Sequence, residues 1–98
     1  MTIEKKIEGT VLKIALEGEL NTMTAPDLEN AVIPELEKVN DVEIDMTRLT
    51  YITSAGLRIL LSAKQRIKDR GNIILEGVCP EIMEVFEITG FTGILTIR

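Results

Sequence analysis

A strand-like pattern passes directly into a helix-like pattern between residues 42 and 67. Its first part has alternating apolar residues, Val42, Ile44 and Met46, and a period of two predicts a strand with one face in a core. Its second part has apolar residues at helical spacing, Leu57, Leu60, Leu61 and Ile67. A strand followed so closely by a helix is the unit from which α/β folds are built. This segment therefore constrains the fold more than any other part of the chain.

Similar patterns on both sides extend this unit to a whole domain. Strands are expected at residues 3–7, 11–16, 42–46, 72–78 and 94–97, and helices at about 25–39, 54–70 and 80–90. A tight turn at Glu8 and Gly9 joins the first two strands into a hairpin. Helices alternate with strands after this hairpin. The predicted fold class is therefore α/β, with one domain over residues 1–98 and a mixed β-sheet packed with helices in the order β-β-α-β-α-β-α-β.

The ends of the helices are predicted from their capping chemistry. Thr24 is a candidate N-cap, and Asp27 follows at a position like that of a capping box. Pro34 lacks a backbone N–H, so we expect a kink or an interruption in the first helix. Lys68 precedes Gly71 at the end of the second helix, an order of charge and glycine that is typical of a helix C-terminus.

Two hydroxyl residues, a small residue and a glycine connect the central strand to the central helix. Thr53 and Ser54 are good N-cap residues, while Ala55 and Gly56 leave the first turn without bulk. A hydroxyl at the positive end of a helix dipole favours anions, including a phosphate carried on the serine itself. Two interpretations stay open from the residues alone: these hydroxyls only cap the helix, or Ser54 is a modification site.

Composition and charge exclude several classes of protein. The single cysteine, Cys79, excludes an internal disulfide and fits a reducing cytoplasm. No signal peptide is expected at the N-terminus, and no apolar stretch approaches the roughly 20 residues that a bilayer-spanning helix needs. A formal net charge of -5 argues against nucleic acid as a partner, because phosphates attract a positive patch. We therefore expect a cytoplasmic protein without a membrane or nucleic-acid partner.

The side-chain chemistry does not support an enzyme. The chain has no histidine, which excludes a Ser-His-acid triad and any histidine-containing metal site. Cys79 cannot build a thiolate metal cluster alone and is expected to pack as a small apolar residue. The glycines form neither a dinucleotide fingerprint nor a phosphate-binding loop, so we expect no cofactor and no metal. The carboxylates expected to face water are Glu17, Glu19, Asp27, Glu43 and Asp45.

Three stretches resemble, in order and spacing, those of the bacterial anti-sigma factor antagonists, which are small STAS domains. Gly18-Glu-Leu-Asn-Thr-Met-Thr-Ala is similar to the family's Gly-Glu-Leu-Asp-x-x-Thr-Ala segment. The strand from Val42 that leads to Ser54-Ala-Gly-Leu is similar to its phosphorylation loop, and the segment from Gly90 to Leu95 is similar to its ending. The resemblance covers essentially the whole chain and implies a STAS-like single domain.

The resemblance implies a phosphorylation-regulated binding switch. In the family, a serine at the place of Ser54 is phosphorylated by an anti-sigma factor with serine kinase activity. The unphosphorylated antagonist sequesters this partner, phosphorylation breaks the complex, and a serine phosphatase restores it. The implied contact surface consists of Asn21, Thr22, Thr53, Ser54, Ala55, Gly56 and Arg58. Asn21 and Thr53 stand where the best-known antagonists carry Asp, so both keep hydrogen bonding and lose negative charge.

Two other functions remain alternatives. The chain could be a constitutive STAS adaptor or scaffold subunit of a transporter or stress-sensing complex, in which Ser54 is merely a helix cap. Nucleotide binding or weak hydrolysis has only the N-terminus of the central helix in its favour.

Overall fold

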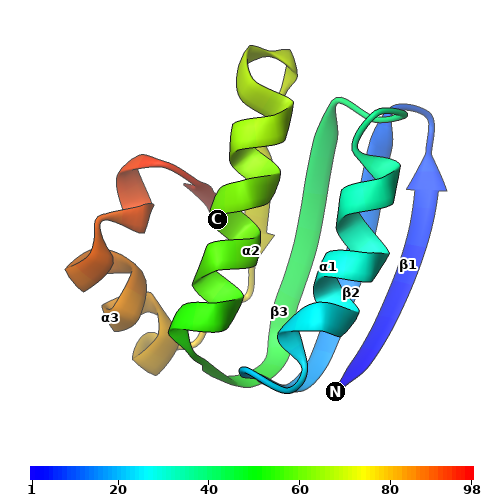
Figure 1. Ribbon diagram of the computed structural model, residues 1–98. Coiled ribbons are helices and arrows are strands. Elements are labelled where there is room, and N and C mark those ends of the chain that lie inside the picture. The colour runs from blue at the N-terminus through cyan, green and yellow to red at the C-terminus, as the bar shows by residue number, and fades with distance from the viewer.

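The strands form one five-stranded sheet in the order β1-β2-β3-β4-β5 in the computed structural model, which describes residues 1–98 (Figure 1). The strands are β1 (Thr2–Glu8), β2 (Val11–Leu20), β3 (Asp41–Ile52), β4 (Ile73–Glu76) and β5 (Thr96–Ile97). The helices are α1 (Ala25–Val32), α2 (Ser54–Ile67) and α3 (Pro80–Thr89). The predicted order of strands and helices is confirmed.

The sheet is mixed, as expected. β1 pairs antiparallel with β2, and Gly9, with a φ of +62°, permits the tight turn between them. The pairs β2–β3, β3–β4 and β4–β5 are all parallel. Each parallel connection contains a helix. α1 and α2 lie side by side on one face of the sheet, and α3 lies near the N-terminal end of α2 (Figure 1).

The face of the sheet under the helices is apolar. Leu12 lies opposite Val42 on the neighbouring strand, and Ile44 lies opposite Leu75. These side chains belong to a single cluster of 24 buried hydrophobic residues, which includes the fully buried Phe86 of α3. No polar or charged residue is buried. Burial of aliphatic side chains, at about 1.5–3 kcal/mol for each large one, therefore stabilises the fold.

The prediction that the second and third strands end near residues 16 and 46 is wrong, because β2 and β3 pair as far as Leu20 and Ile52. β3 contains two β-bulges, since the register shifts by one residue after Asp45 and again after Leu49. A bulge breaks the alternation of apolar and polar residues without ending the pairing. The alternation therefore stops at Met46 although the strand continues. β4 and β5 are shorter than expected.

The first helix is interrupted as predicted, because α1 ends at Val32 and a 3-10 turn over Ile33–Glu35 contains Pro34. The predicted position of Thr24 is confirmed, but the side-chain capping expected of it is absent. Thr24 occupies the N-cap position, but its side chain makes no capping hydrogen bond. Its hydroxyl instead donates to the carbonyl oxygen of Glu19 at 2.8 Å, which ties the start of α1 to the end of β2.

Gly71 does not cap α2, which corrects the second capping prediction. Its backbone is extended, with a φ of −176°, and the positive φ of 53° belongs to Lys68. Gly71 is required for a different reason: a Cβ there would collide with the carbonyl oxygen of Asn40. The expectation for α3 is confirmed, because it ends at Gly90, with a φ of +80°.

The first turn of α2 packs closely against the ends of β2 and β3. A Cβ at Gly56 would lie 2.6 Å from Cγ of Leu20 and 3.0 Å from Cγ1 of Ile52. Both of these side chains are buried, so neither can move away freely. Gly56 therefore sets how near the helix comes to the sheet.

Replacing Gly56 by alanine should destabilise the protein. Alanine favours a helix by up to about 1 kcal/mol over glycine, but overpacking a core costs about 1–3 kcal/mol, and we expect the clash to dominate. Urea unfolding measures the change. Gly93→Ala is the matched control, because a Cβ at Gly93 meets nothing within 4 Å. Equal stability of Gly56→Ala and Gly93→Ala would contradict the close packing.

The first β-bulge is held by a carboxylate. Both the hydroxyl and the N–H of Thr47 donate to Oδ1 of Asp45, at 2.6 and 2.9 Å. Both hydrogen bonds lower the pKa of Asp45 below its usual value, and the one from the hydroxyl has the larger effect. The positive charge of nearby Arg48 lowers the pKa further.

Thr47→Val should raise the pKa of Asp45, because it removes the stronger donor. A carboxylate with a lowered folded-state pKa stabilises the fold above its unfolded-state pKa of about 3.9 and loses this contribution as pH falls through the folded-state value. The stability difference between wild type and Thr47→Val should therefore be full at neutral pH and shrink under acidic conditions. Carboxyl ¹³C titration and urea unfolding check both effects. Thr92→Val, at an exposed position, should show no such pH dependence.

Candidate functional site

β2 and β3 are parallel neighbours, so their carboxyl ends lie side by side at the same end of the sheet. Leu20 and Ile52 are paired, and the N–H of Thr53 donates to the carbonyl oxygen of Leu20 at 3.0 Å. The segment that follows β2 is therefore brought next to the start of α2. Clefts at the carboxyl ends of parallel strands are the usual place for binding sites in α/β folds.

Asn21 organises the segment between β2 and α1. Its Oδ1 accepts hydrogen bonds from the N–H groups of Met23 and Thr24, at 2.9 and 3.1 Å. Its own N–H donates to Oγ1 of Thr24 at 2.8 Å. Because Asn21 holds the turn from within, Thr22 and Met23 are left at the surface, and Met23 is 87% exposed.

Ser54 is the first residue of α2 and is exposed. Its hydroxyl makes no hydrogen bond within the chain, so the interpretation of Ser54 as a helix cap is wrong. Thr53 occupies the N-cap position with an extended backbone, but it also makes no capping hydrogen bond. Its Oγ1 is buried without a partner. The first helical hydrogen bond runs from the N–H of Leu57 to the carbonyl oxygen of Thr53 at 3.1 Å.

The electrostatic environment of Ser54 favours negative charge. The first N–H groups of a helix have no acceptor within it and carry the positive end of its dipole. The first turn of α2 contains no acidic residue. Arg58 is exposed one turn further along, and residues at this spacing share one face of a helix. An anion on the Ser54 oxygen would therefore meet positive charge on the protein itself.

Six of the seven predicted contact residues are exposed or half-buried, and one is buried. Thr22, Ser54 and Arg58 are exposed, and Asn21, Thr53 and Ala55 are half-buried. Gly56 is buried against Leu20 and Ile52, so it acts through packing and not through a surface contact. Met23 was missed. A large apolar residue between two threonines in a polar loop is the signal that could have found it.

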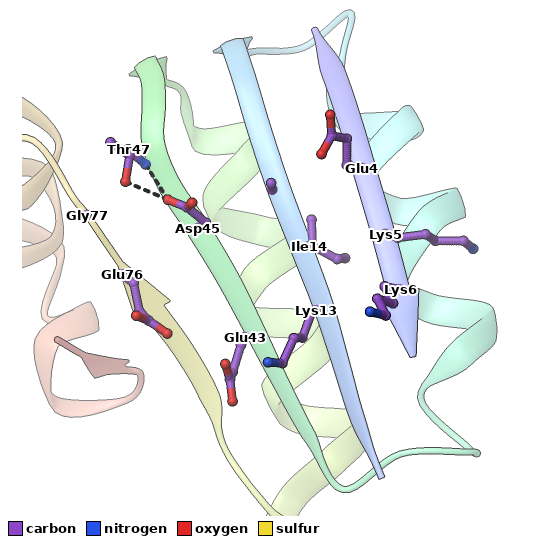
Figure 2. A pocket seen from close by; sticks show the side chains of 11 residues that line it. Glu4, Lys5, Lys6, Lys13, Ile14, Glu43, Asp45, Thr47, Glu76 and Gly77 are labelled. Carbon is purple, nitrogen blue, oxygen red and sulfur yellow. Dashed lines mark hydrogen bonds between the residues drawn. The ribbon is translucent and has the colours of Figure 1, made fainter. Parts of the chain in front are cut away.

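The uncovered face of the sheet carries a hollow with charges of both signs (Figure 2). Lys6 and Lys13 face Glu43 and Glu76 across it, and Asp45 lies beside Thr47 (Figure 2). No group of acidic or cysteine side chains is arranged to hold a metal ion. Of the carboxylates expected to face water, Glu43 is half-buried, and the exposed ones are Glu17, Glu19, Asp27 and Asp45.

Two further observations concern the helices and the cysteine. None of the helices has both the length and the apolar character required to cross a bilayer. Cys79 is half-buried and packs against the hydrophobic cluster, as predicted.

Comparison with known proteins gives consistent results. The model of the STAS domain family matches residues 2–98. BtrV of Bordetella bronchiseptica, provisionally described as an anti-sigma factor antagonist, is 39% identical over 94 residues, which cover 94% of this chain and 80% of BtrV. The anti-sigma-B factor antagonist of Listeria monocytogenes is 30% identical over 91 residues, covering 89% of this chain and 78% of that protein.

A solved structure shares the fold. The Bacillus cell fate determinant SpoIIAA in its phosphorylated form superposes with a TM-score of 0.79 at 18% identity, over 99% of this chain and 91% of SpoIIAA. The matched family model and the two sequence relatives cover nearly all of the chain. This protein therefore belongs to the STAS domain family and, within it, to the anti-sigma factor antagonists.

Proposed function

We propose that this protein is a cytoplasmic switch that binds an anti-sigma factor with serine kinase activity and is released when that kinase phosphorylates Ser54. Family membership supports binding to an anti-sigma factor, and the relatives in Bordetella and Listeria carry the matching names. The observation that carries the assignment of the site is the exposed, unbonded hydroxyl of Ser54 at the first position of α2. The protein acts by binding and not by catalysis.

Ser54 has the properties that a kinase substrate needs. Its hydroxyl is exposed and is not engaged by another group, so it can enter a kinase active site without unfolding the helix. A phosphate on Ser54 would lie at the positive end of α2 and within reach of Arg58. Phosphorylation would therefore leave the fold intact and change the surface alone.

Added charge on this surface explains release of the partner. Met23 and Thr22 are exposed on the loop that the hydrogen bond between Thr53 and Leu20 brings next to the start of α2, so a partner that covers this loop would also cover the serine. A phosphate brings about −1.5 to −2 charges, and removing these charges from water in a packed interface is unfavourable. A serine phosphatase would restore the binding form.

Intact-mass measurement tests the assignment. Incubation with the cognate anti-sigma factor and Mg-ATP should add one phosphate to the wild type and none to Ser54→Ala. Ser62→Ala is the matched control on the same helix and should be phosphorylated like the wild type. A phosphate that persists in Ser54→Ala would contradict the assignment.

Partner binding distinguishes a switch from a constitutive adaptor. Ser54→Asp should weaken binding of the anti-sigma factor at least about tenfold, which corresponds to about 1.4 kcal/mol, while Ser54→Ala should keep it. Isothermal titration calorimetry measures both affinities. Equal binding by Ser54→Asp and Ser54→Ala would support the adaptor instead.

Two substitutions at Asn21 should distinguish its role in holding the turn from a role in binding the partner. Asn21→Ala removes the acceptor of two hydrogen bonds and should reduce stability by about 0.5–2 kcal/mol, as for a lost helix cap. Asn21→Asp keeps an oxygen at the same place, so its stability should stay near that of the wild type. Any change in partner affinity of Asn21→Asp then reports the added charge. Loss of stability in Asn21→Asp as large as in Asn21→Ala would contradict this role.

A further inference from the structure

β1 is the longer of the two edge strands of the sheet. It has seven residues and pairs only with β2, whereas the other edge strand, β5, has two. The outer N–H and C=O groups of an edge strand can pair with another strand. Ile7 is 42% exposed on this edge, although it lies opposite the buried Leu12. The edge therefore leaves both polar backbone groups and an apolar side chain uncovered.

The sequence of β1 is complementary to itself in one antiparallel register. With Lys5 at a two-fold axis, Glu4 lies opposite Lys6 of a second copy, and Ile3 lies opposite Ile7. Directly opposite residues of antiparallel strands lie on the same face of the sheet. This register therefore places two Glu–Lys pairs on the uncovered face and two Ile–Ile pairs on the helix-covered face.

Neighbouring two-fold registers lack this match. Centring the axis on Glu4 places this glutamate opposite itself. Centring it on Lys6 places Lys6 opposite itself and Glu4 opposite Glu8. Like charges directly opposite one another destabilise a sheet. β1 also carries two lysines and two glutamates, so it is neutral in a chain whose formal net charge is -5.

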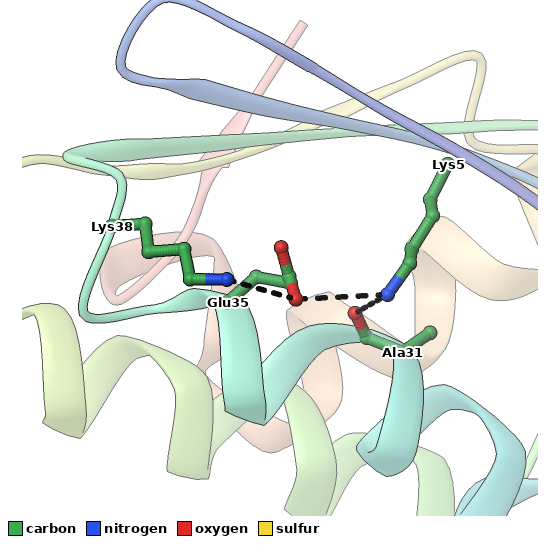
Figure 3. Close-up of polar contacts among 4 residues, drawn as sticks. All are labelled: Lys5, Ala31, Glu35 and Lys38. Carbon is green, nitrogen blue, oxygen red and sulfur yellow. Dashed lines mark hydrogen bonds and ion pairs between the residues drawn. The ribbon is translucent and has the colours of Figure 1, made fainter.

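The lysine at the axis faces a carboxylate within its own copy. Nζ of Lys5 donates to the carbonyl oxygen of Ala31 at 3.3 Å and lies 3.9 Å from Oε1 of Glu35 (Figure 3). Glu35 is also within 3.9 Å of Nζ of Lys38. Two Lys5 side chains that meet at the axis would therefore bring two Glu35 carboxylates with them, which offsets part of their repulsion because each Glu35 is shared with Lys38.

We infer that β1 is a docking edge for a second copy of this chain, with Lys5 on the two-fold axis and the two sheets joined into one. The edge is short, and small interfaces give weak, transient complexes. The dimer should therefore form in a concentration-dependent way. β1 of the two copies runs antiparallel, so the Ser54 sites lie at opposite ends of the joined sheet and both stay accessible.

Charge reversal tests the register. Sedimentation equilibrium of the wild type up to about 1 mM, a concentration that detects even a weak complex, should show dimers. Glu4→Lys and Lys6→Glu should each weaken dimerisation at least about tenfold, and the double reversal should restore it. Glu84→Lys, an exposed position on α3, changes the net charge as Glu4→Lys does and should dimerise like the wild type. A wild type that stays monomeric, or a double variant that stays weak, would overturn the inference.

Disulfide trapping tests the same geometry independently. In a Cys79→Ala background, Lys5→Cys should form a disulfide-linked dimer on oxidation, because opposite Cα atoms of paired strands lie within disulfide range. Thr2→Cys is the control on the same strand. Its two copies would lie about 20 Å apart, at about 3.4 Å per residue, and should not link. Circular dichroism verifies that both variants fold. Equal linking of both variants, or of neither, would contradict the register.

Discussion

The contact between Gly56 and the side chains of Leu20 and Ile52 is the constraint on which the functional end of the molecule depends. It brings the first turn of α2 down onto the ends of two paired strands. Because Ser54 lies two residues earlier in the same turn, this packing fixes its position relative to the loop after β2. The glycine and the serine therefore have separate tasks within one turn. The glycine faces the core and sets how near the helix comes to the sheet, and the serine faces solvent with its hydroxyl unbonded.

A rigid platform of this kind favours a switch that works by charge and not by movement. The core contains no buried polar or charged residue, so no buried network of hydrogen bonds or ion pairs links Ser54 to the rest of the fold. A phosphate on Ser54 would be accommodated by the helix dipole and by Arg58, both of which are already in place. The free energy of the switch would then reside in the complex with the partner, where a buried phosphate must lose its water.

Local patterns in the sequence predict the helices and strands but not all of the residues at which they begin and end. The alternation at Val42–Met46 and the helical spacing after Leu57 identify β3 and α2, and Pro34 identifies the interruption after α1. The bulges in β3 could not be predicted, because an extra residue removes the very alternation that identifies a strand. The position of Gly71 after a helix suggests a cap, but glycine is needed there because a side chain would collide with the carbonyl oxygen of Asn40, which is distant in the sequence. The position of Ser54 was predictable, whereas the burial of Gly56 depends on contacts between elements.

Asn21 shows how a residue of the site can be changed without altering the fold beside it. Its side-chain oxygen accepts two backbone N–H groups, and a carboxylate oxygen could accept the same two. Asparagine in place of the aspartate of the best-known antagonists should therefore keep these two hydrogen bonds and remove only a negative charge. The turn holds Thr22 and Met23 at the surface. If the turn keeps its geometry with either residue, a functional difference at this position arises from the charge that the partner meets and not from the shape of the turn.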